Sequence, residues 1–329
     1  MKVLNDWFLK HKRDLPWRKK RDPYATWIAE VMLQQTGVLV VIPYFERWMK
    51  ALPDIHSLAA APKETVLKLW EGLGYYSRAR NLLKGAIYIV ENFQGNIPSD
   101  RDLLQTIPGI GPYTSAAIAT FSFGQKIAAV DANVARFISR FLALEDKSLF
   151  EQEATKLLPD KDPWIVAEAM IEMGATICRK KPDCLACPVQ KSCLAFLQNR
   201  QYELPLPTKR AATTYLEKTV IIICFKDHFL LKNPEEKGVM ADLWEFPTDI
   251  AYPECIRHNL PIQKHSFTRY SVTLTPYLIF PENINFLEQR GFSWYSIEQM
   301  KNLTFSAGHK RILNELENYL KNRLSQGIL

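Results

Sequence analysis

The sequence lacks the long apolar segments that target or anchor a protein. No hydrophobic run approaches the roughly 20 residues that a membrane-spanning helix needs. The stretch 1–17 carries charges throughout, without an uninterrupted apolar core or a small-residue cleavage site. We therefore expect a soluble, globular protein of the cytoplasm, where disulfide bonds are rare and the six cysteines stay reduced.

The sequence also lacks internal repeats and low-complexity segments, so its fold must rest on ordinary hydrophobic cores. At 329 residues, of which 47% are hydrophobic, the chain is long enough for two domains. Its net charge of +7 lies entirely in residues 1–210, which hold 29 lysines and arginines against 22 acidic residues, while residues 211–329 hold 13 of each. A basic first part suits a polyanion such as nucleic acid, although a generically basic, solvated surface has the same composition.

The periodicity of apolar residues divides the chain into two parts. Up to about residue 200 they recur at three- and four-residue spacing, which predicts an all-α first domain over residues 1–202. The segment 203–214, ELPLPTKRAATT, combines prolines with polar and basic residues as linkers do. Beyond it, the runs TVIIICF and SVTLTPYLIF have the composition of strands, and HKRILNELENYLKNRL is an amphipathic helix. We therefore predict an α+β second domain over residues 215–329.

Four of the cysteines cluster within sixteen residues in the pattern C-x5-C-x2-C-x5-C: Cys178, Cys184, Cys187 and Cys193. Four thiolates this close can surround one compact metal centre. A structural zinc site more often separates two C-x2-C pairs by a longer loop, and none of the six histidines lies nearby. The spacing therefore favours an iron–sulfur cluster, with tetrahedral zinc as the alternative. Cys224 and Cys255 lie outside this cluster, and we expect both to be small buried hydrophobes.

One acid lies inside an otherwise apolar helix. Asp22 and Pro23 are typical of a helix start, and apolar residues follow at helical spacing. Glu30 falls beside Trp27 at the border of this apolar stripe, where its carboxyl is expected to be partly desolvated. Desolvation favours the protonated form of an acid, which is the form that donates a proton.

The stretch 103–121, LLQTIPGIGPYTSAAIATF, predicts a helix, a tight turn and a second helix. Gly109 and Gly111 permit a turn whose backbone N–H groups point outward, and such a turn can hold a phosphate without reading a base. Taken alone, the turn is equally a plain helix–helix connection. Shortly after it, Asp131 opens another helix in AAVDANVARFISRF, and taken alone it is a helix N-cap.

Together these features resemble the endonuclease III superfamily of helix–hairpin–helix DNA glycosylases. Four motifs narrow the resemblance to the adenine DNA glycosylases of the MutY family: LPWR at 15–18, EVMLQQT at 30–36, WEGLGYYSRARNL at 70–82 and VDANV at 130–134. The similarity is dense over residues 5–200. From residue 215 onward it is carried mainly by LWEFP and HSFTRY, which resemble that family's MutT-like, Nudix-like domain.

The resemblance implies a monofunctional enzyme of base excision repair, which flips adenine opposite 8-oxoguanine or guanine out of double-stranded DNA and hydrolyses its N-glycosidic bond. Glu30 would be the general acid that protonates adenine N7, and Asp131 would stabilise the oxocarbenium-like sugar, either electrostatically or through a covalent intermediate. Tyr113 and Asn133 match positions that assist these acids. The resemblance also implies a [4Fe-4S] cluster on the four clustered cysteines, a monomer, and a place of action at the bacterial nucleoid.

Further residues match the family's DNA contacts. Gln34, Gln35 and Tyr75 match residues that enter the duplex around the orphaned 8-oxoguanine, where amides and a phenol can both stack and hydrogen-bond. The remaining predicted contacts are Trp17, Arg18 and Glu168 around the adenine pocket, Thr36, Gly109 and Gly111 along the DNA, and Phe267, Thr268 and Arg269 in the second domain. Without the resemblance, Trp17 and Tyr75 are better explained as core packing.

Three departures from the family pattern stand out. The first cysteine spacing is five residues where the family usually has six, and Ala135 replaces a frequent lysine. The Phe-Ser-His triplet that reads 8-oxoguanine is here Phe267-Thr268-Arg269. Because arginine has five donors and no acceptor, we expect Arg269 to add salt-dependent binding while weakening discrimination, or else to point into solvent.

Three other functions compete with this interpretation. A bifunctional endonuclease III-type glycosylase/lyase acting on oxidised pyrimidines would need a lysine at the position of Tyr113, and a phenol cannot form a Schiff base. A nucleoside diphosphate hydrolase would need a helix with closely spaced glutamates for Mg²⁺ after Phe246, where the chain runs PTDIAYPECIRH. A DNA-binding module without activity is disfavoured because Glu30 and Asp131 both keep their motif context.

Overall fold

The computed structural model describes residues 1–207, 212–238, 240–248, 250, 256–267, 269–284 and 291–325. The chain folds into two compact units, Met1–Ala61 with Asn81–Lys209 and Pro62–Arg80 with Arg210–Leu329. The predicted domains are continuous in sequence, whereas each unit is assembled from two separate segments. Of the predicted residues, Thr268, Cys255 and the side chain of Phe267 lie outside what is described.

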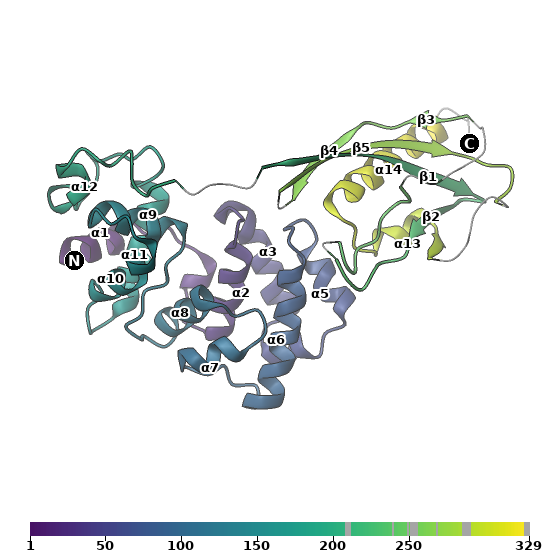
Figure 1. Ribbon diagram of the computed structural model, residues 1–329. Coiled ribbons are helices and arrows are strands. Elements are labelled where there is room, and N and C mark those ends of the chain that lie inside the picture. Colours follow the sequence, from purple (N-terminus) through teal and green to yellow (C-terminus); the bar gives the residue numbers. More distant parts are fainter. Residues whose placement is uncertain are drawn as a thin grey trace. The chain divides into compact units, whose positions relative to one another are not determined.

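The first unit is helical, as the spacing of its apolar residues predicts (Figure 1). Its elements are α1 (Lys2–His11), η1 (Pro16–Arg18), α2 (Pro23–Leu33), α3 (Val38–Ala51), α4 (Ile55–Ala59), most of α6 (Ser77–Phe93), α7 (Arg101–Thr106), α8 (Pro112–Phe121), α9 (Ala132–Phe141), η2 (Lys147–Leu149), α10 (Phe150–Lys156), α11 (Pro163–Thr176), η3 (Gln190–Ser192) and α12 (Leu194–Leu197). Across the described parts of the whole chain, none of the helices combines the length and apolarity needed to cross a membrane.

Aspartates start the helices that matter for the site. The side chain of Asp22 accepts a hydrogen bond from Ala25 N at 2.7 Å, with Pro23 at the first helical position of α2. Asp100 caps α7 in the same way, accepting from two backbone N–H groups. Each cap satisfies donors that a helix start would leave without partners. The local sequence therefore fixes where α2 and the hairpin begin.

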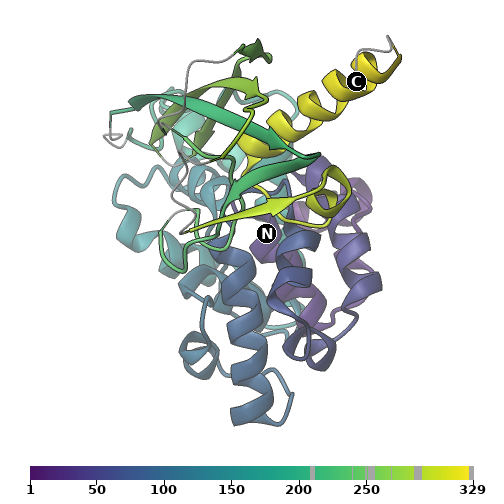
Figure 2. The ribbon, with the colours of Figure 1, turned by 90° about the vertical axis from the view of Figure 1, so that its right-hand side faces the viewer.

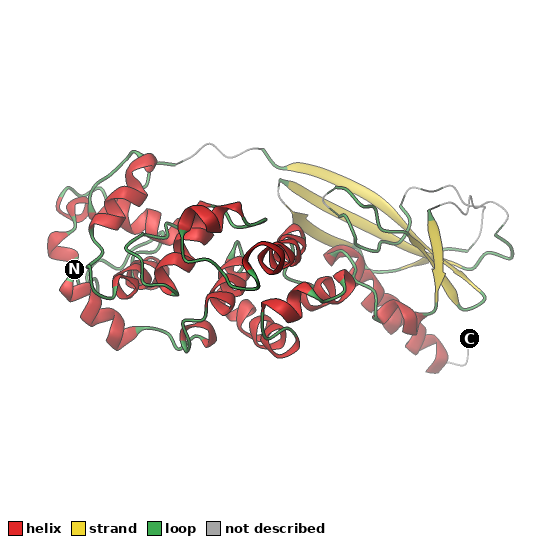
Figure 3. Cartoon of the chain, turned by 90° about the horizontal axis from the view of Figure 1, so that it is seen from below, coloured by secondary structure: helices red, strands yellow, loops and turns green. Residues whose placement is uncertain are grey.

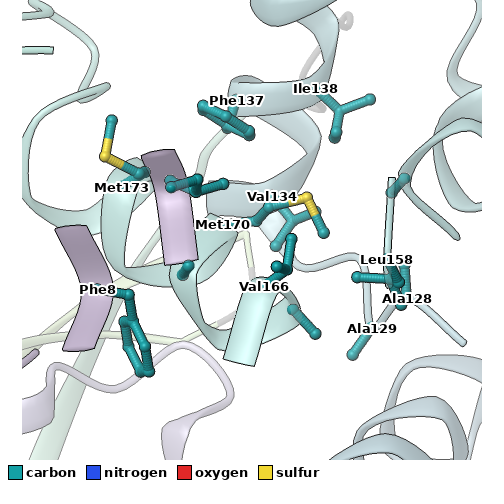
Figure 4. Close-up of a cluster of buried hydrophobic side chains, with 14 of the residues drawn as sticks. Phe8, Ala128, Ala129, Val134, Phe137, Ile138, Leu158, Val166, Met170 and Met173 are labelled. Atoms are coloured by element: carbon teal, nitrogen blue, oxygen red, sulfur yellow. The ribbon is translucent and has the colours of Figure 1, made fainter. Parts of the chain in front are cut away.

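One hydrophobic core joins helices that are distant in sequence. Phe8 of α1, Phe137 of α9 and Met170 of α11 all belong to it, and each is almost completely buried. Figure 4 shows Phe8, Phe137 and Met170 among the buried side chains of this core. Full burial of each such side chain stabilises the fold by roughly 1.5 to 3 kcal/mol. This core holds the start of α9 beside α11, and both helices supply residues to the candidate site.

The second unit is built on a six-stranded sheet in the order β3-β5-β1-β2-β6, with β4 also paired to β5. Its strands are β1 (Thr214–Phe225), β2 (His228–Lys232), β3 (His258–Asn259), β4 (Gln263–Phe267), β5 (Tyr270–Ile279) and β6 (Phe292–Tyr295), and its helices are α5 (Lys63–Trp70), α13 (Ile297–Lys301) and α14 (Ala307–Ser325). The two predicted strand runs form β1 and β5, which are parallel and neighbours in the sheet. The predicted closing helix is α14.

Both faces of the central strand β1 are covered. Val220 and Ile222 join a core with Leu316 of α14, whereas Ile221 and Ile223 pack on the opposite face. Figure 2 and Figure 3 show α14 lying along one face of the sheet. A strand that is buried on both faces has a continuous apolar sequence instead of an alternating one, which explains the run TVIIICF.

Candidate active site

Glu30 is buried inside α2 and bonded to the hairpin. The residue is 7% exposed, and the hydroxyl of Tyr113, at the second position of α8, donates to its Oε2 at 2.6 Å. The pKa of Glu30 is raised to about 7, mainly by burial; the Tyr113 hydrogen bond opposes this rise and the nearby charge of Asp131 adds to it. The predicted partial desolvation is thus more complete than expected. A large fraction of this carboxyl is protonated near neutral pH.

Asp131 is held rigidly at the start of α9. One carboxylate oxygen accepts hydrogen bonds from Asn133 N at 2.9 Å and Val134 N at 2.7 Å, and the other accepts from Asn133 Nδ2 at 2.7 Å. Arg136 in turn donates to Asn133 Oδ1 at 2.8 Å. Burial raises the pKa of Asp131, while the bonds from Val134 and Asn133 oppose that rise. The carboxylate therefore caps a helix and also has a fixed orientation.

The two acids and their partners line one cavity of about 970 Å³. A volume of this size is typical of pockets that enclose a small molecule or a flipped nucleotide. Six further predicted residues line the same cavity: Trp17, Arg18, Gln34, Gln35, Thr36 and Glu168. The fold thus gathers, from α2, η1, α8, α9 and α11, side chains that are spread over most of the first unit's sequence.

Two acids on α11 anchor the predicted pocket arginine. Arg18 Nε lies 3.2 Å from Glu168 Oε2, and Arg18 Nη2 lies 2.9 Å from Glu172 Oε2. Arg13 Nε reaches Glu172 Oε1 at 2.5 Å. Burial alone would raise the pKa of Glu172, but the two arginines together hold it below its ordinary value. Sequence analysis missed Glu172 and Arg13; the four-residue spacing from Glu168, which puts both acids on one helix face, was the available signal.

Two of the three residues predicted to enter the duplex, Gln35 and Tyr75, have a strained backbone. Gln35 follows the end of α2 with φ +58°, and Tyr75, in the second unit, has φ +48°. Non-glycine residues seldom adopt this left-handed conformation, and when they do it is often at functional sites. Gln34 Nε2 donates to Thr114 Oγ1 at 3.5 Å. Trp17 lines the cavity and also packs edge-on against Phe45. It therefore contributes both to the pocket wall and to core packing.

The hairpin turn needs glycine at one of the two predicted positions. Gly109 has φ +85°, and a Cβ there would lie 2.6 Å from Asn81 Cβ. Gly111 has φ −93° and ψ −176°, a conformation that any residue can adopt. A Cβ at Gly111 would nevertheless meet nothing within 4 Å. This N-cap of α8 is therefore open to a close approach by another molecule.

The four clustered cysteines surround a single small cavity, together with Arg140. Arg140 Nη1 donates to Cys178 Sγ at 3.5 Å, and Cys193 Sγ donates to Arg140 O at 3.4 Å. Within the described residues, three or more His, Cys, Asp or Glu side chains do not gather into a group that could hold one metal ion. The donor set of four thiols around one cavity, with a guanidinium offsetting their negative charge, fits an iron–sulfur cluster.

Arg269 lies on the turn between β4 and β5. Its side chain is exposed, with the guanidinium 5.3 Å from the centroid of the Tyr270 ring and Nη2 3.3 Å from the Tyr270 hydroxyl. In the part of the chain described between Phe246 and β3, no residue is helical. The described residues between Phe246 and β3 therefore do not form the glutamate-bearing helix that a Mg²⁺-dependent hydrolase would use after that position.

Comparison with known proteins identifies the family. Residues 28–160 match the family described as HhH-GPD superfamily base excision DNA repair protein, and residues 219–315 match the NUDIX domain. An adenine DNA glycosylase from Buchnera aphidicola is 30% identical and covers 97% of each chain. The adenine DNA glycosylase of Rattus norvegicus is 31% identical, and the match covers 96% of this chain and 77% of the rat protein. The chain belongs to the adenine DNA glycosylase family.

The predicted fold class of this adenine DNA glycosylase family member is confirmed, with a helix–hairpin–helix first part and a Nudix-like second part. A solved thermostable thymine-DNA glycosylase superposes with a TM-score of 0.56 at 28% identity, covering 60% of this chain and 94% of that one. The glycosylase architecture is thus shared with enzymes of other base preference. The choice of base therefore depends on the residues of the site, not on the fold.

Proposed function

We propose that this chain removes adenine mispaired with 8-oxoguanine or guanine from double-stranded DNA, by hydrolysing the N-glycosidic bond in base excision repair. The observation that carries the proposal is a buried Glu30, held by Tyr113, in the same cavity as a rigidly oriented Asp131. A carboxyl with a pKa of about 7 can donate a proton at neutral pH and accept one afterwards.

The reaction uses the two acids in sequence. Glu30 gives its proton to adenine N7, which makes the base a better leaving group as the N9–C1′ bond breaks. Asp131 stabilises the positive charge that develops on the sugar, electrostatically or as a covalent nucleophile. Glu30, now ionised, takes a proton from the water whose oxygen bonds to C1′. Adenine leaves, and the sugar keeps the hydroxyl.

Tyr113 serves as a positioning group for the acid. Burial raises the pKa of Tyr113 well above 10, so the phenol stays protonated and keeps donating to Glu30 Oε2. Asn133 likewise positions Asp131, because its side-chain amide donates a hydrogen bond to the Asp131 carboxylate. Because Tyr113 stands where a lyase would carry a lysine, the enzyme lacks an amine there to form a Schiff base with the sugar aldehyde. This supports hydrolysis without strand cleavage.

Recognition of DNA is divided among several groups of residues. Trp17, Arg18 and Glu168 surround the flipped adenine. Gln34, Gln35 and Tyr75 occupy the space beside the orphaned base, and the left-handed backbone of Gln35 and Tyr75 supports this role. Thr36 is a further DNA contact. The open hairpin turn at Gly109 and Gly111 binds a phosphate, and Phe267, Thr268 and Arg269 contact the lesion strand.

The four cysteines are proposed to hold a [4Fe-4S] cluster, which supplies a rigid framework for residues 178–193. Arg140 stays beside it, donating to Cys178. We further propose a monomeric cytoplasmic enzyme whose domains extend over residues 1–202 and 215–329, joined by a linker at 203–214. The second domain reads DNA and has no hydrolase activity of its own.

The test is adenine release from duplexes that carry A opposite 8-oxoguanine, G, C or T, under single-turnover conditions. We expect release from the first two and little from the others. A parallel incubation with borohydride should trap no protein–DNA adduct. Excision of an oxidised pyrimidine, or a trapped adduct, would favour the glycosylase/lyase function instead.

A further inference from the structure

A short segment of the N-terminal half belongs structurally to the C-terminal half. Pro62–Arg80 forms one compact unit with Arg210–Leu329. This segment contains α5 and the turn that carries Tyr75, whose side chain is 40% exposed. Within the turn, Gly72 has φ +104°, Gly74 has φ +70° and Tyr75 has φ +48°. A strained turn that presents an exposed aromatic persists only when its surroundings hold it in place.

The loop at Ala241 and Asp242 binds both ends of this segment. Lys63 Nζ donates to Asp242 Oδ1 at 2.7 Å, and Arg80 Nη1 lies 3.7 Å from Asp242 Oδ2. Arg80 Nη1 also donates to the carbonyl of Ala241 at 2.8 Å. A single carboxylate thus ties the start of α5 to the residue that ends the segment.

A second loop, at 303–306, binds the middle of the segment on both sides of Tyr75. Before the turn, Glu71 Oε1 accepts from Phe305 N at 3.1 Å, and Lys68 Nζ donates to the carbonyl of Leu303 at 2.9 Å. After the turn, the Tyr76 hydroxyl donates to the carbonyl of Phe305 at 3.2 Å. The loop at 303–306 therefore holds the Tyr75 turn from both of its ends.

The two loops are fixed to each other, so they act as one support. Trp244 N donates to the carbonyl of Thr304 at 2.9 Å, and Asp242 N donates to that of Glu235 at 2.9 Å. The side chains of Asp242 and Glu71 are only 13% and 14% exposed. Ion pairs shielded in this way are less weakened by solvent than exposed ones.

We propose that Asp242 and Glu71 are positioning residues that hold the Tyr75 turn, so that the Nudix-like part acts on adenine excision through Tyr75. This inference rests on the proposed function, in which Tyr75 enters the duplex. Loss of either acid then weakens productive DNA binding while the chemistry at Glu30 and Asp131 is left intact.

The variant Asp242→Asn tests the proposal with little disturbance of the backbone. Asp242 has φ +61°, and asparagine tolerates that conformation while removing the charge. Asp227→Asn is a matched control, because Asp227 has φ +60° and is exposed at the turn between β1 and β2. In single-turnover excision from A opposite 8-oxoguanine, we expect Asp242→Asn to raise the half-saturating enzyme concentration roughly 3- to 10-fold. The maximal rate constant should change less than about 2-fold, and the control should match wild type.

A double-mutant cycle separates positioning from general stabilisation. In a Tyr75→Ala background, Asp242→Asn should add little further loss, because the effects of two residues are not additive when one acts through the other. If Asp242→Asn weakens binding by the same factor with and without Tyr75, the proposal is overturned. If Asp242→Asn melts at a lower temperature than the control, the same double-mutant cycle is measured with Glu71→Gln instead. In that variant the amide oxygen of the glutamine can still accept the hydrogen bond from Phe305 N. A wild type that releases no adenine would overturn the proposed function itself.

Discussion

Replacing Glu30 by glutamine should inactivate the enzyme and at the same time stabilise it. Burial moves the pKa of Glu30 from 4.5 to about 7. The folded protein therefore binds a proton between these pH values that the unfolded chain does not, and its stability falls as pH rises from 4.5 to 7. At about 1.4 kcal/mol for each pKa unit, the buried carboxylate costs about 3 kcal/mol of stability above pH 7. Glu30→Gln keeps the shape and removes that cost.

The assay is urea or thermal denaturation of wild type and Glu30→Gln from pH 5 to pH 8.5. We expect the two proteins to differ little near pH 5, and the variant to be increasingly more stable up to pH 7, with a plateau above it. Glu91→Gln, an exposed acid on α6, serves as the control and should show no such dependence. A pH-independent difference, or a variant less stable than wild type at pH 8, would refute the reasoning. Adenine release by Glu30→Gln should fall by on the order of 10² to 10⁴.

Three further predictions concern other parts of the site. Tyr113→Phe removes the donor that lowers the pKa of Glu30, so the descending limb of the pH–rate profile should move to higher pH; an unchanged midpoint would argue against the bond. Cys187→Ser should give poorly soluble or DNA-binding-deficient protein that has lost iron, whereas wild type purified without oxygen should be yellow-brown; stoichiometric zinc without iron would contradict the cluster. Arg269→His should increase the preference for A opposite 8-oxoguanine over A opposite G by about 1 to 3 kcal/mol and flatten the salt dependence of binding. If neither changes, Arg269 does not contact DNA.

The features predicted best from the sequence are those set by local chemistry. The start of α2 at Asp22-Pro23 and the cap of α9 at Asp131 depend on residues within one helical turn. The continuous apolar run of β1 likewise signals burial on both faces. For Glu30, periodicity located the acid at the edge of an apolar stripe, but its hydrogen bond to Tyr113, 83 residues away, could not be derived from spacing.

The features that were missed depend on contacts between distant segments. Glu172 gains its role only because Arg13 and Arg18 fold back onto α11. Pro62–Arg80 joins the second unit through Asp242 and the loop at 303–306, and its own sequence is an ordinary helix and turn. The spacing of Glu168 and Glu172 places both acids on one helix face, but their arginine partners, like the partners of Pro62–Arg80, lie too far along the chain for a local pattern to identify them.

The central claim is that a buried, proton-carrying Glu30 drives the departure of adenine. Its most direct test is the single-turnover rate constant for adenine release from A opposite 8-oxoguanine, measured at saturating enzyme from pH 5 to pH 9. We predict that the rate constant falls as the pH rises, with a midpoint near 7, the pKa of Glu30. In Glu30→Gln the rate constant should be much smaller and should no longer show this fall. A flat profile across this range, or a Glu30→Gln enzyme with the wild-type rate, would contradict the account.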